Sequence, residues 1–199
     1  WQLIGLDTRE DGATLSFAYD TAAQPIAEWP FAAELQLDIH LGERLALSLT
    51  TRNLGDRELP ISQALHTYFA VSDVRQVRIE GLEGRSYIDT LQDWKSVRQQ
   101  GAVTFSGETD RIYLDTPAQL SIVDPLWKRR ILMRSQGSAS AVGVEPMDRQ
   151  GQAPVAIRRR RLAGHALHRA RQRAGRRADP RPRRRIPPRR DAVVASAVR

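Results

Sequence analysis

The chain has 199 residues, 41% of them hydrophobic, and a formal net charge of +8. This length suffices for one hydrophobic core, and no apolar run approaches the roughly 20 residues that a membrane-spanning helix needs, so we expect no membrane association. Cysteine is absent, which excludes disulfides, thiolate metal sites and cysteine nucleophiles.

The N-terminal residues Trp1–Asp7 have neither the basic start nor the apolar stretch of a secretory signal. We therefore expect a cytoplasmic protein. Because the sequence does not begin with methionine, we also expect that it starts inside a longer gene product.

The first predicted elements are strands in which apolar and polar residues alternate. Alternation runs over residues 14–19 and, without a break, over residues 34–41. A glycine-containing turn at 42–44 then leads to a second alternating run over 45–50. Two runs of period 2 joined by a short turn predict a hairpin with one buried face.

Further short strands are predicted, with glycine, aspartate and proline between them, at 63–71, 75–80, 103–105, 111–114 and 119–123. No internal repeat and no amphipathic helix stands out. Many short antiparallel strands separated by turns predict an all-β domain over residues 1–142, either a β-sandwich or a barrel.

The last predicted segment, residues 143–199, has a different composition. From residue 149 onward it holds seventeen arginines, no lysine, no aromatic residue and two acids, a charge of +15 that leaves −7 for the first 148 residues. Such a segment buries too little apolar area to offset its ordering entropy, so we predict disorder. A nucleic-acid-binding arm is the functional alternative, but without aromatic residues for base stacking we expect at most non-specific binding.

Several motifs occur together in a fixed order. Residues 63–69 read QALHTYF and are followed by Val71-Ser72-Asp73; WPF stands at 29–31, GLEG at 81–84 and ETDRIY at 108–113. From Trp1 to about Ala141 this set resembles the aldose 1-epimerase superfamily, most closely its hexose-6-phosphate mutarotase (glucose-6-phosphate 1-epimerase) branch. The resemblance implies a galactose mutarotase-like β-sandwich. It is incomplete here, because family members are longer at the front, where they carry arginines that grip the sugar phosphate.

The coding of the basic segment indicates a shifted reading frame. Residues 144–148 can be encoded GTG GAA CCC ATG GAC, which one base later reads Trp-Asn-Pro-Trp, the next motif expected of the family. The same frame through residues 157–170 permits FADDGWQGMRCIEP, which resembles the family's ending and contains its catalytic glutamate. We therefore expect a frameshift close to residue 143. The glutamate would fall across the codons of Arg169 and Ala170, so this chain lacks it.

The resemblance implies mutarotation, in which a base deprotonates the C1 hydroxyl of a sugar while an acid protonates the ring oxygen. This is acid–base catalysis, for which we expect neither metal nor redox cofactor. His66 matches the histidine of the family's HTYF motif, and an imidazole suits the acid role. The predicted strand also places His66 beside Tyr68, with small Ala64 and Ala70 leaving room for a ligand. The alternative is a structural, partly buried histidine.

Asp110 matches the family's sugar-binding aspartate, which would accept hydrogen bonds from ring hydroxyls. Its alternative is a turn-capping role after Gly107. The other polar and aromatic candidates are predicted to be structural: Asp73 and Asp89 as turn residues, His40 as a solvated residue, Trp94 and Trp127 as core residues.

The sequence thus predicts a hexose-6-phosphate mutarotase-like isomerase that interconverts the α and β anomers of a hexose 6-phosphate or related sugar. We expect activity to be impaired, because the catalytic glutamate is missing. Two alternatives remain open: a non-catalytic carbohydrate-binding β-sandwich, and a β domain with a nucleic-acid-binding arginine-rich arm.

Overall fold

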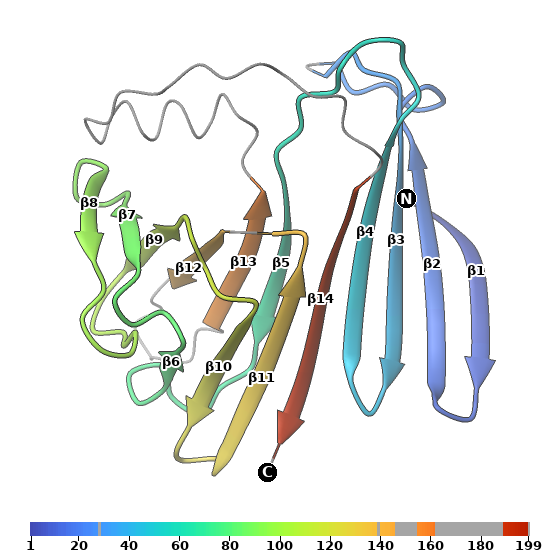
Figure 1. The fold of residues 1–199 in the computed structure, drawn as a ribbon. Coiled ribbons are helices and arrows are strands. Elements are labelled where there is room, and N and C mark those ends of the chain that lie inside the picture. Colours follow the sequence, from blue (N-terminus) through green and yellow to red (C-terminus); the bar gives the residue numbers. More distant parts are fainter. Residues whose placement is uncertain (28, 139, 146–154, 162–188, 199) are drawn as a thin grey trace. The chain divides into compact units, whose positions relative to one another are not determined.

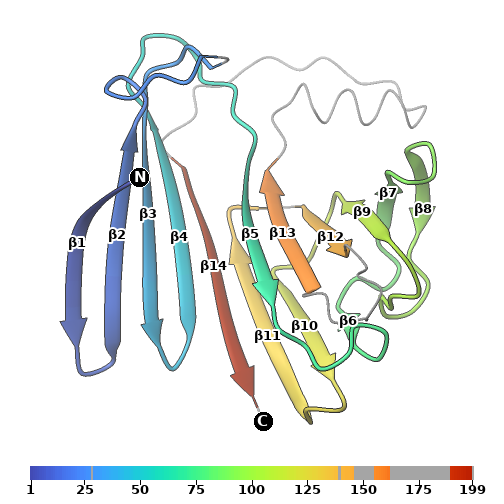
Figure 2. The ribbon, with the colours of Figure 1, turned by 180° about the vertical axis from the view of Figure 1, so that it is seen from behind.

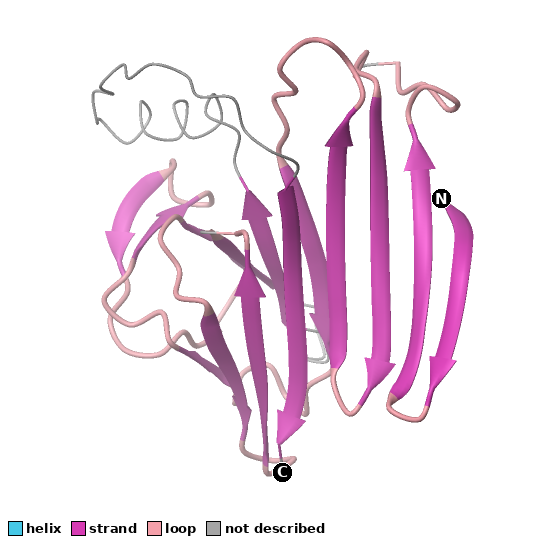
Figure 3. Ribbon diagram, turned by 45° about the vertical axis from the view of Figure 1, so that its right-hand side comes forward, coloured by secondary structure: helices cyan, strands magenta, loops and turns pink. Residues whose placement is uncertain are grey.

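A computed structural model describes residues 1–27, 29–138, 140–145, 155–161 and 189–198 (Figure 1). The regular elements of these residues are all strands (Figure 3). Among them no helix occurs that has the length and apolar character needed to cross a membrane. The prediction of an all-β fold is confirmed.

The strands follow one another in chain order as β1 (Gln2–Arg9), β2 (Gly12–Asp20), β3 (Ala33–Gly42), β4 (Leu45–Asn53), β5 (Gln63–Phe69), β6 (Arg78–Glu80), β7 (Ser86–Asp89), β8 (Lys95–Arg98), β9 (Thr109–Tyr113), β10 (Gln119–Asp124), β11 (Arg129–Gln136), β12 (Ala141–Glu145), β13 (Val155–Arg161) and β14 (Arg189–Val198). The contacts divide the chain into two compact units, the first built mainly from Trp1–Pro60 and the second mainly from Ile61–Arg134.

The first unit contains an antiparallel sheet in the order β1-β2-β3-β4-β14. Its centre is the hairpin that alternation predicts, with Leu37 opposite Leu49 and Ile39 opposite Leu47. Leu49 is buried, whereas most other residues of this apolar face are half-buried and Leu41 is exposed. The hairpin is therefore confirmed, but its apolar face is less completely buried than expected.

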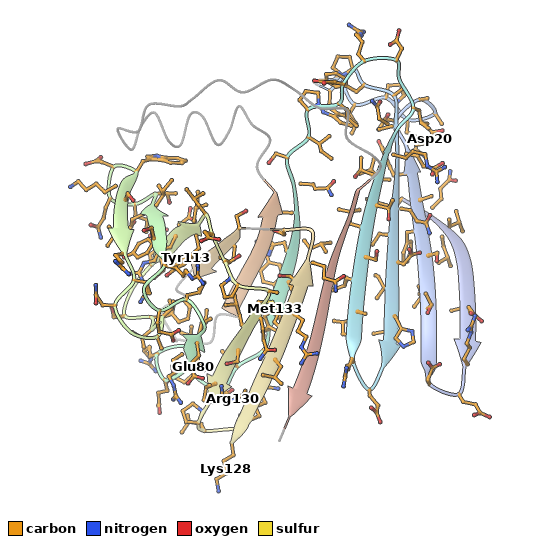
Figure 4. The ribbon with its side chains drawn as sticks, viewed as in Figure 1. Asp20, Glu80, Tyr113, Lys128, Arg130 and Met133 are labelled. Atoms are coloured by element: carbon orange, nitrogen blue, oxygen red, sulfur yellow. The ribbon has the colours of Figure 1, made fainter. Side chains whose placement is uncertain are left out.

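The second unit contains two antiparallel sheets. One has the order β5-β13-β12-β9-β7-β8 and the other contains β11, β10 and β6 (Figure 2). The large side chains that are fully buried in this unit come from both sheets and from the loop before β6, and include Tyr113, Leu120, Ile122, Met133, Val74 and Val77; Figure 4 labels Tyr113 and Met133. Ile88 is also fully buried, but it is opposite Ile112 and packs with it on the other face of the sheet from Tyr113. Two sheets that share one core are the arrangement of a β-sandwich.

The basic segment contributes strands to both units. β13 pairs with β5 and β12, and β14 pairs with β4, in regions where disorder was predicted. A strand edge offers unpaired N–H and C=O groups to any extended segment, whatever its side chains, which composition alone does not reveal. Residues 146–154, 162–188 and 199 lie outside the described residues, so there the prediction of disorder stays a prediction.

Tyr113 of β9 gives the second unit a predicted sensitivity to alkali. Its ring is 1% exposed, and its hydroxyl donates a 2.7 Å hydrogen bond to Oε1 of Gln99. Burial raises the pKa of Tyr113 from 10.0 to about 12, although nearby Arg111 opposes the shift. Because the folded pKa lies above the unfolded one, the stabilisation is complete below pH 10 and is lost as the pH rises towards 12.

We therefore expect the free energy of unfolding to fall by about 2–3 kcal/mol between pH 10 and 12 on account of this group. Urea unfolding at a series of pH values measures it. The Tyr113→Phe variant should lose this component of the alkaline slope; an unchanged slope would show that another group is responsible.

Candidate active site

His66 lies in the middle of β5, on the side of the strand opposite to Phe69. Alternation along β5 turns Leu65, Thr67 and Phe69 to one face, where Phe69 is buried. The other face carries His66, which is half-buried, and Tyr68, whose side chain is 60% exposed. His66 is thus outside any sealed interior, on a face that a ligand can reach.

The His66 and Tyr68 rings are stacked. Their centroids are 4.4 Å apart with an angle of 21° between the planes, and the Tyr68 hydroxyl lies 3.5 Å from His66 Nε2. The Nδ1 atom of His66 is shielded from solvent. Nε2 is therefore the imidazole nitrogen through which a proton can pass to a ligand, and the phenol stands beside it.

The strand register places Asp110 on the same face as His66. Across the sheet, His66 is opposite Arg158 of β13, which is opposite Val142 of β12, which is opposite Ile112 of β9. Directly opposed residues share a face, and so do residues two apart in one strand. Asp110, two residues before Ile112, therefore belongs to the face of His66.

The next row of the same register runs from Tyr68 through Ala156 and Val144 to Asp110. Three strand spacings separate its ends, about 14 Å between backbones. The four strands lie side by side in both views of the ribbon (Figures 1 and 2). The sheet thus puts an aromatic ring and a carboxylate at the two ends of one row.

Asp110 is the second residue of β9 and is half-buried. Its carbonyl oxygen accepts hydrogen bonds from the backbone N–H of Thr90 at 3.0 Å and from the Thr90 hydroxyl at 3.1 Å. The position in a paired strand excludes the turn-capping alternative. The contact with sugar hydroxyls that the resemblance implies for this side chain stays a prediction.

The remaining candidates have mixed outcomes. Asp73 is a turn residue as predicted, and its carboxylate accepts the backbone N–H of Arg75 at 3.0 Å. Asp89 is instead the buried last residue of β7, where its carboxylate accepts the N–H of Leu91 at 3.1 Å as the chain leaves the strand. The prediction for His40 is wrong: it is half-buried, and its Nδ1 lies 3.0 Å from the Thr14 hydroxyl.

The two tryptophans differ from each other. Trp94 packs against Ile88 and Ile112, as expected of a core residue. Trp127 is exposed, and core burial was the wrong prediction for it, because the Arg129 guanidinium lies 4.5 Å from its ring centroid at a turn. A cation over the ring face stabilises a tryptophan that remains in contact with water.

The sequence analysis did not predict the three residues that hold the chain in place just after β5. Asp124 is fully buried and accepts hydrogen bonds from the Ser72 backbone N–H at 2.9 Å, from the Ser72 hydroxyl, and from the Trp127 N–H at 3.2 Å. Arg129 donates to the carbonyl oxygen of Ala70 and has its Nε 3.8 Å from Asp124. We call Asp124, Ser72 and Arg129 the β5 anchor.

Burial alone would raise the pKa of Asp124. The hydrogen bonds from Ser72 and Trp127, together with the charge of Arg129, outweigh this effect and hold the pKa below its usual value. Asp124 is therefore a carboxylate at neutral pH. The anchor fixes the end of the strand that carries His66.

The first unit has a cavity that the sequence did not indicate. It has a volume of about 530 Å³ and is lined by Gly5, Leu6, Asp7, Arg9, Asp11, Gly12, Thr14, Ser16 and His40. Neither His66 nor Asp110 takes part in it. Within the described ranges, no three histidine, aspartate or glutamate residues are grouped so as to hold a metal ion.

Comparison with known proteins points in one direction. The sequence profile of a family described as "Aldose 1-epimerase" matches residues 1–168. A protein of Cenchrus ciliaris called "Putative glucose-6-phosphate 1-epimerase" is 36% identical over 137 residues, which are 66% of this chain and 42% of that protein. A protein of the same name from Escherichia coli K12 is 31% identical over 148 residues, 73% of this chain and 48% of that protein.

The fold comparison agrees. The crystal structure of a "putative mutarotase" from Salmonella typhimurium superposes with a TM-score of 0.78 at 22% identity, covering 99% of this chain and 64% of that one. The Slr1438 protein of Synechocystis superposes with a TM-score of 0.71 at 19% identity, covering 99% and 65%. The chain thus has a galactose mutarotase-like fold. It spans less than half the length of the Cenchrus ciliaris and Escherichia coli relatives.

Proposed function

The chain belongs to the aldose 1-epimerase family, and we propose that it is the His66-bearing part of a hexose-6-phosphate mutarotase. The reaction interconverts the α and β anomers of an aldohexose 6-phosphate. The relatives named after glucose-6-phosphate 1-epimerase support this substrate class. The observation that carries the proposal is the imidazole of His66 on an accessible sheet face that also holds Asp110.

His66 has the role of general acid. Its Nε2 protonates the ring oxygen as the C1–O5 bond breaks, while a base removes the proton of the C1 hydroxyl. The open aldehyde turns about its C1–C2 bond and closes on the other face, and the proton returns to the imidazole. Asp110 accepts hydrogen bonds from ring hydroxyls and holds the sugar in register with His66.

The proposal includes the expected loss of the catalytic base, the family's glutamate, from this sequence. In the shifted frame, the codon of the family's glutamate is expected to overlap the codons of Arg169 and Ala170. Both positions lie outside the described residues. Loss of one member of an acid–base pair lowers a rate by about 10²–10⁴. We therefore propose that the chain by itself binds the sugar phosphate and turns it over slowly.

The test is the exchange between the anomers of glucose 6-phosphate, measured by magnetisation-transfer NMR with the chain and with the Escherichia coli relative at equal concentration. We expect the chain to be about 10²–10⁴-fold slower per molecule. Equal rates would refute the proposed impairment. Faster exchange of unphosphorylated glucose than of glucose 6-phosphate would refute the substrate class.

A further inference from the structure

Asp110 lies close to the beginning of its strand. β9 starts one residue earlier, at Thr109, and the chain before it bends at residues 106–107. β12 pairs with Asp110 on one side of β9. On the other side, the paired positions of β7 and β9 end with Asp89 opposite Arg111, so Asp110 is one position beyond the last pair (Figure 1). Strand ends open more easily than strand centres, so this side of Asp110 needs further support if its carboxylate is to keep one position.

Thr90 supplies this support. It follows β7 directly, and its backbone N–H and its hydroxyl both donate to the carbonyl oxygen of Asp110, at 3.0 and 3.1 Å. The N–H bond extends the antiparallel ladder by one residue, as any residue except proline could do. The hydroxyl bond is additional and depends on the side chain.

The turn that contains Thr90 is itself held in place. The carboxylate of the buried Asp89 accepts the Leu91 N–H at 3.1 Å and so spans Thr90. Thr90 is half-buried, which partly shields its hydrogen bonds from water. Two hydrogen bonds from one residue in a fixed turn orient the peptide group that follows the Cα atom of Asp110.

We infer that Thr90 is a positioning residue, whose hydroxyl fixes the backbone of Asp110 so that the Asp110 carboxylate meets the sugar hydroxyls in register with His66. The inference rests on the proposed function and adds to it a residue that the resemblance does not include. Directional hydrogen bonds weaken steeply with distance and angle, so a displacement of about 1 Å at Asp110 is enough to weaken binding. Thr90 thus acts on binding through Asp110, and proton transfer remains with His66.

The experiment measures the Kd of glucose 6-phosphate for the 199-residue chain by saturation-transfer NMR. Thr90→Val keeps the shape and removes the hydroxyl, whereas Thr90→Ser keeps the hydroxyl. Thr21→Val is the matched control, because the Thr21 hydroxyl also donates to backbone carbonyls, those of Phe31 at 2.6 Å and Ala33 at 3.2 Å, but in the first unit. We expect a Kd about 3–10-fold higher for Thr90→Val, and a Kd within about 2-fold of the wild type for Thr90→Ser and Thr21→Val.

A double-mutant cycle with Asp110→Ala tests whether Thr90 acts through Asp110. In the Asp110→Ala background, Thr90→Val should change the Kd by less than about 2-fold, because the side chain that Thr90 positions is absent. A merely structural role of Thr90 would lower the urea midpoint of unfolding, as we expect for Thr21→Val, but would not make the effect on Kd depend on Asp110. Far-UV circular dichroism of all variants controls for folding.

The outcomes separate the inference from the proposed function. An unchanged Kd for Thr90→Val beside a raised Kd for Asp110→Ala would overturn the inference and leave the mutarotase proposal standing. An equal loss of affinity on Thr90→Val in both backgrounds would also overturn it, because Thr90 would then act independently of Asp110. If Asp110→Ala binds as tightly as the wild type, the contact of Asp110 with the sugar is refuted, and the inference with it. If the wild type does not bind glucose 6-phosphate at all, both proposals fail.

Discussion

A polypeptide that carries the shifted frame after residue 143, joined to the N-terminal segment of a family member, is expected to exchange glucose 6-phosphate anomers about 10²–10⁴-fold faster than the 199-residue chain. In our proposal, the shifted frame encodes the carboxylate base across the codons of Arg169 and Ala170. In that polypeptide, His66→Gln should remove the gain, because glutamine occupies a similar volume but donates no proton at neutral pH.

Magnetisation-transfer NMR gives both rates under one set of conditions. His40→Gln is the matched control, because His40 is also half-buried but lies in the first unit, paired with Thr14. Its exchange rate should stay within 2-fold of the parent, as expected for a residue that takes no part in the chemistry. A His66→Gln rate equal to the parent rate would show that the acid is another group.

The second large effect concerns stability. Replacing the buried Asp124 by alanine is expected to lower the free energy of unfolding by about 3 kcal/mol, because it leaves the half-buried Ser72 N–H without its acceptor and Arg129 without its counter-charge. Asp115→Ala is the control: Asp115 pairs with Arg85 at 3.0 Å but is 88% exposed. An exposed pair contributes at most about 1 kcal/mol. Urea unfolding followed by tryptophan fluorescence measures both.

Asp124 also makes the free energy of unfolding depend on pH under acidic conditions. Because the folded pKa of Asp124 is lowered, its stabilisation is present above the unfolded value near 4 and is lost as the pH falls below it. Asp124→Asn keeps the shape and removes the titration, so its stability should depend less on pH in this range. Parallel curves for Asp124→Asn and the wild type would contradict the role of this carboxylate.

Local patterns predicted the elements whose side chains alternate strictly. The hairpin of β3 and β4 was found because four leucine or isoleucine residues follow one another at every second position. β1 was missed for a physical reason: its register shifts between Leu3 and Gly5, so that Leu3 and Leu6, three positions apart, lie on one face. A β-bulge of this kind breaks the period of 2 on which the prediction depends. In β11 the register is unbroken, and it is the run of three apolar residues Ile131–Met133 that hides the alternation in the sequence.

The candidate site, too, could be predicted only in part from the sequence. The resemblance of the HTYF motif identified His66, and its position in a strand followed from alternation. Its relation to Asp110 could not be derived, because β13 and β12 stand between the two residues and come later in the chain. The β5 anchor was missed because Asp124 stands before Pro125 and reads as an ordinary turn residue. Its burial depends on Ser72, fifty-two positions away.

His66 and Tyr68 are separated by one residue of a strand that has a neighbour on one side only among the described strands. If β5 slipped along β13 by a single position, both rings would turn to the core together and Leu65, Thr67 and Phe69 would come out. The imidazole and the phenol therefore change face together. A mixture of the two registers would contain molecules with both side chains on the accessible face and molecules with neither, but none with only one of them there.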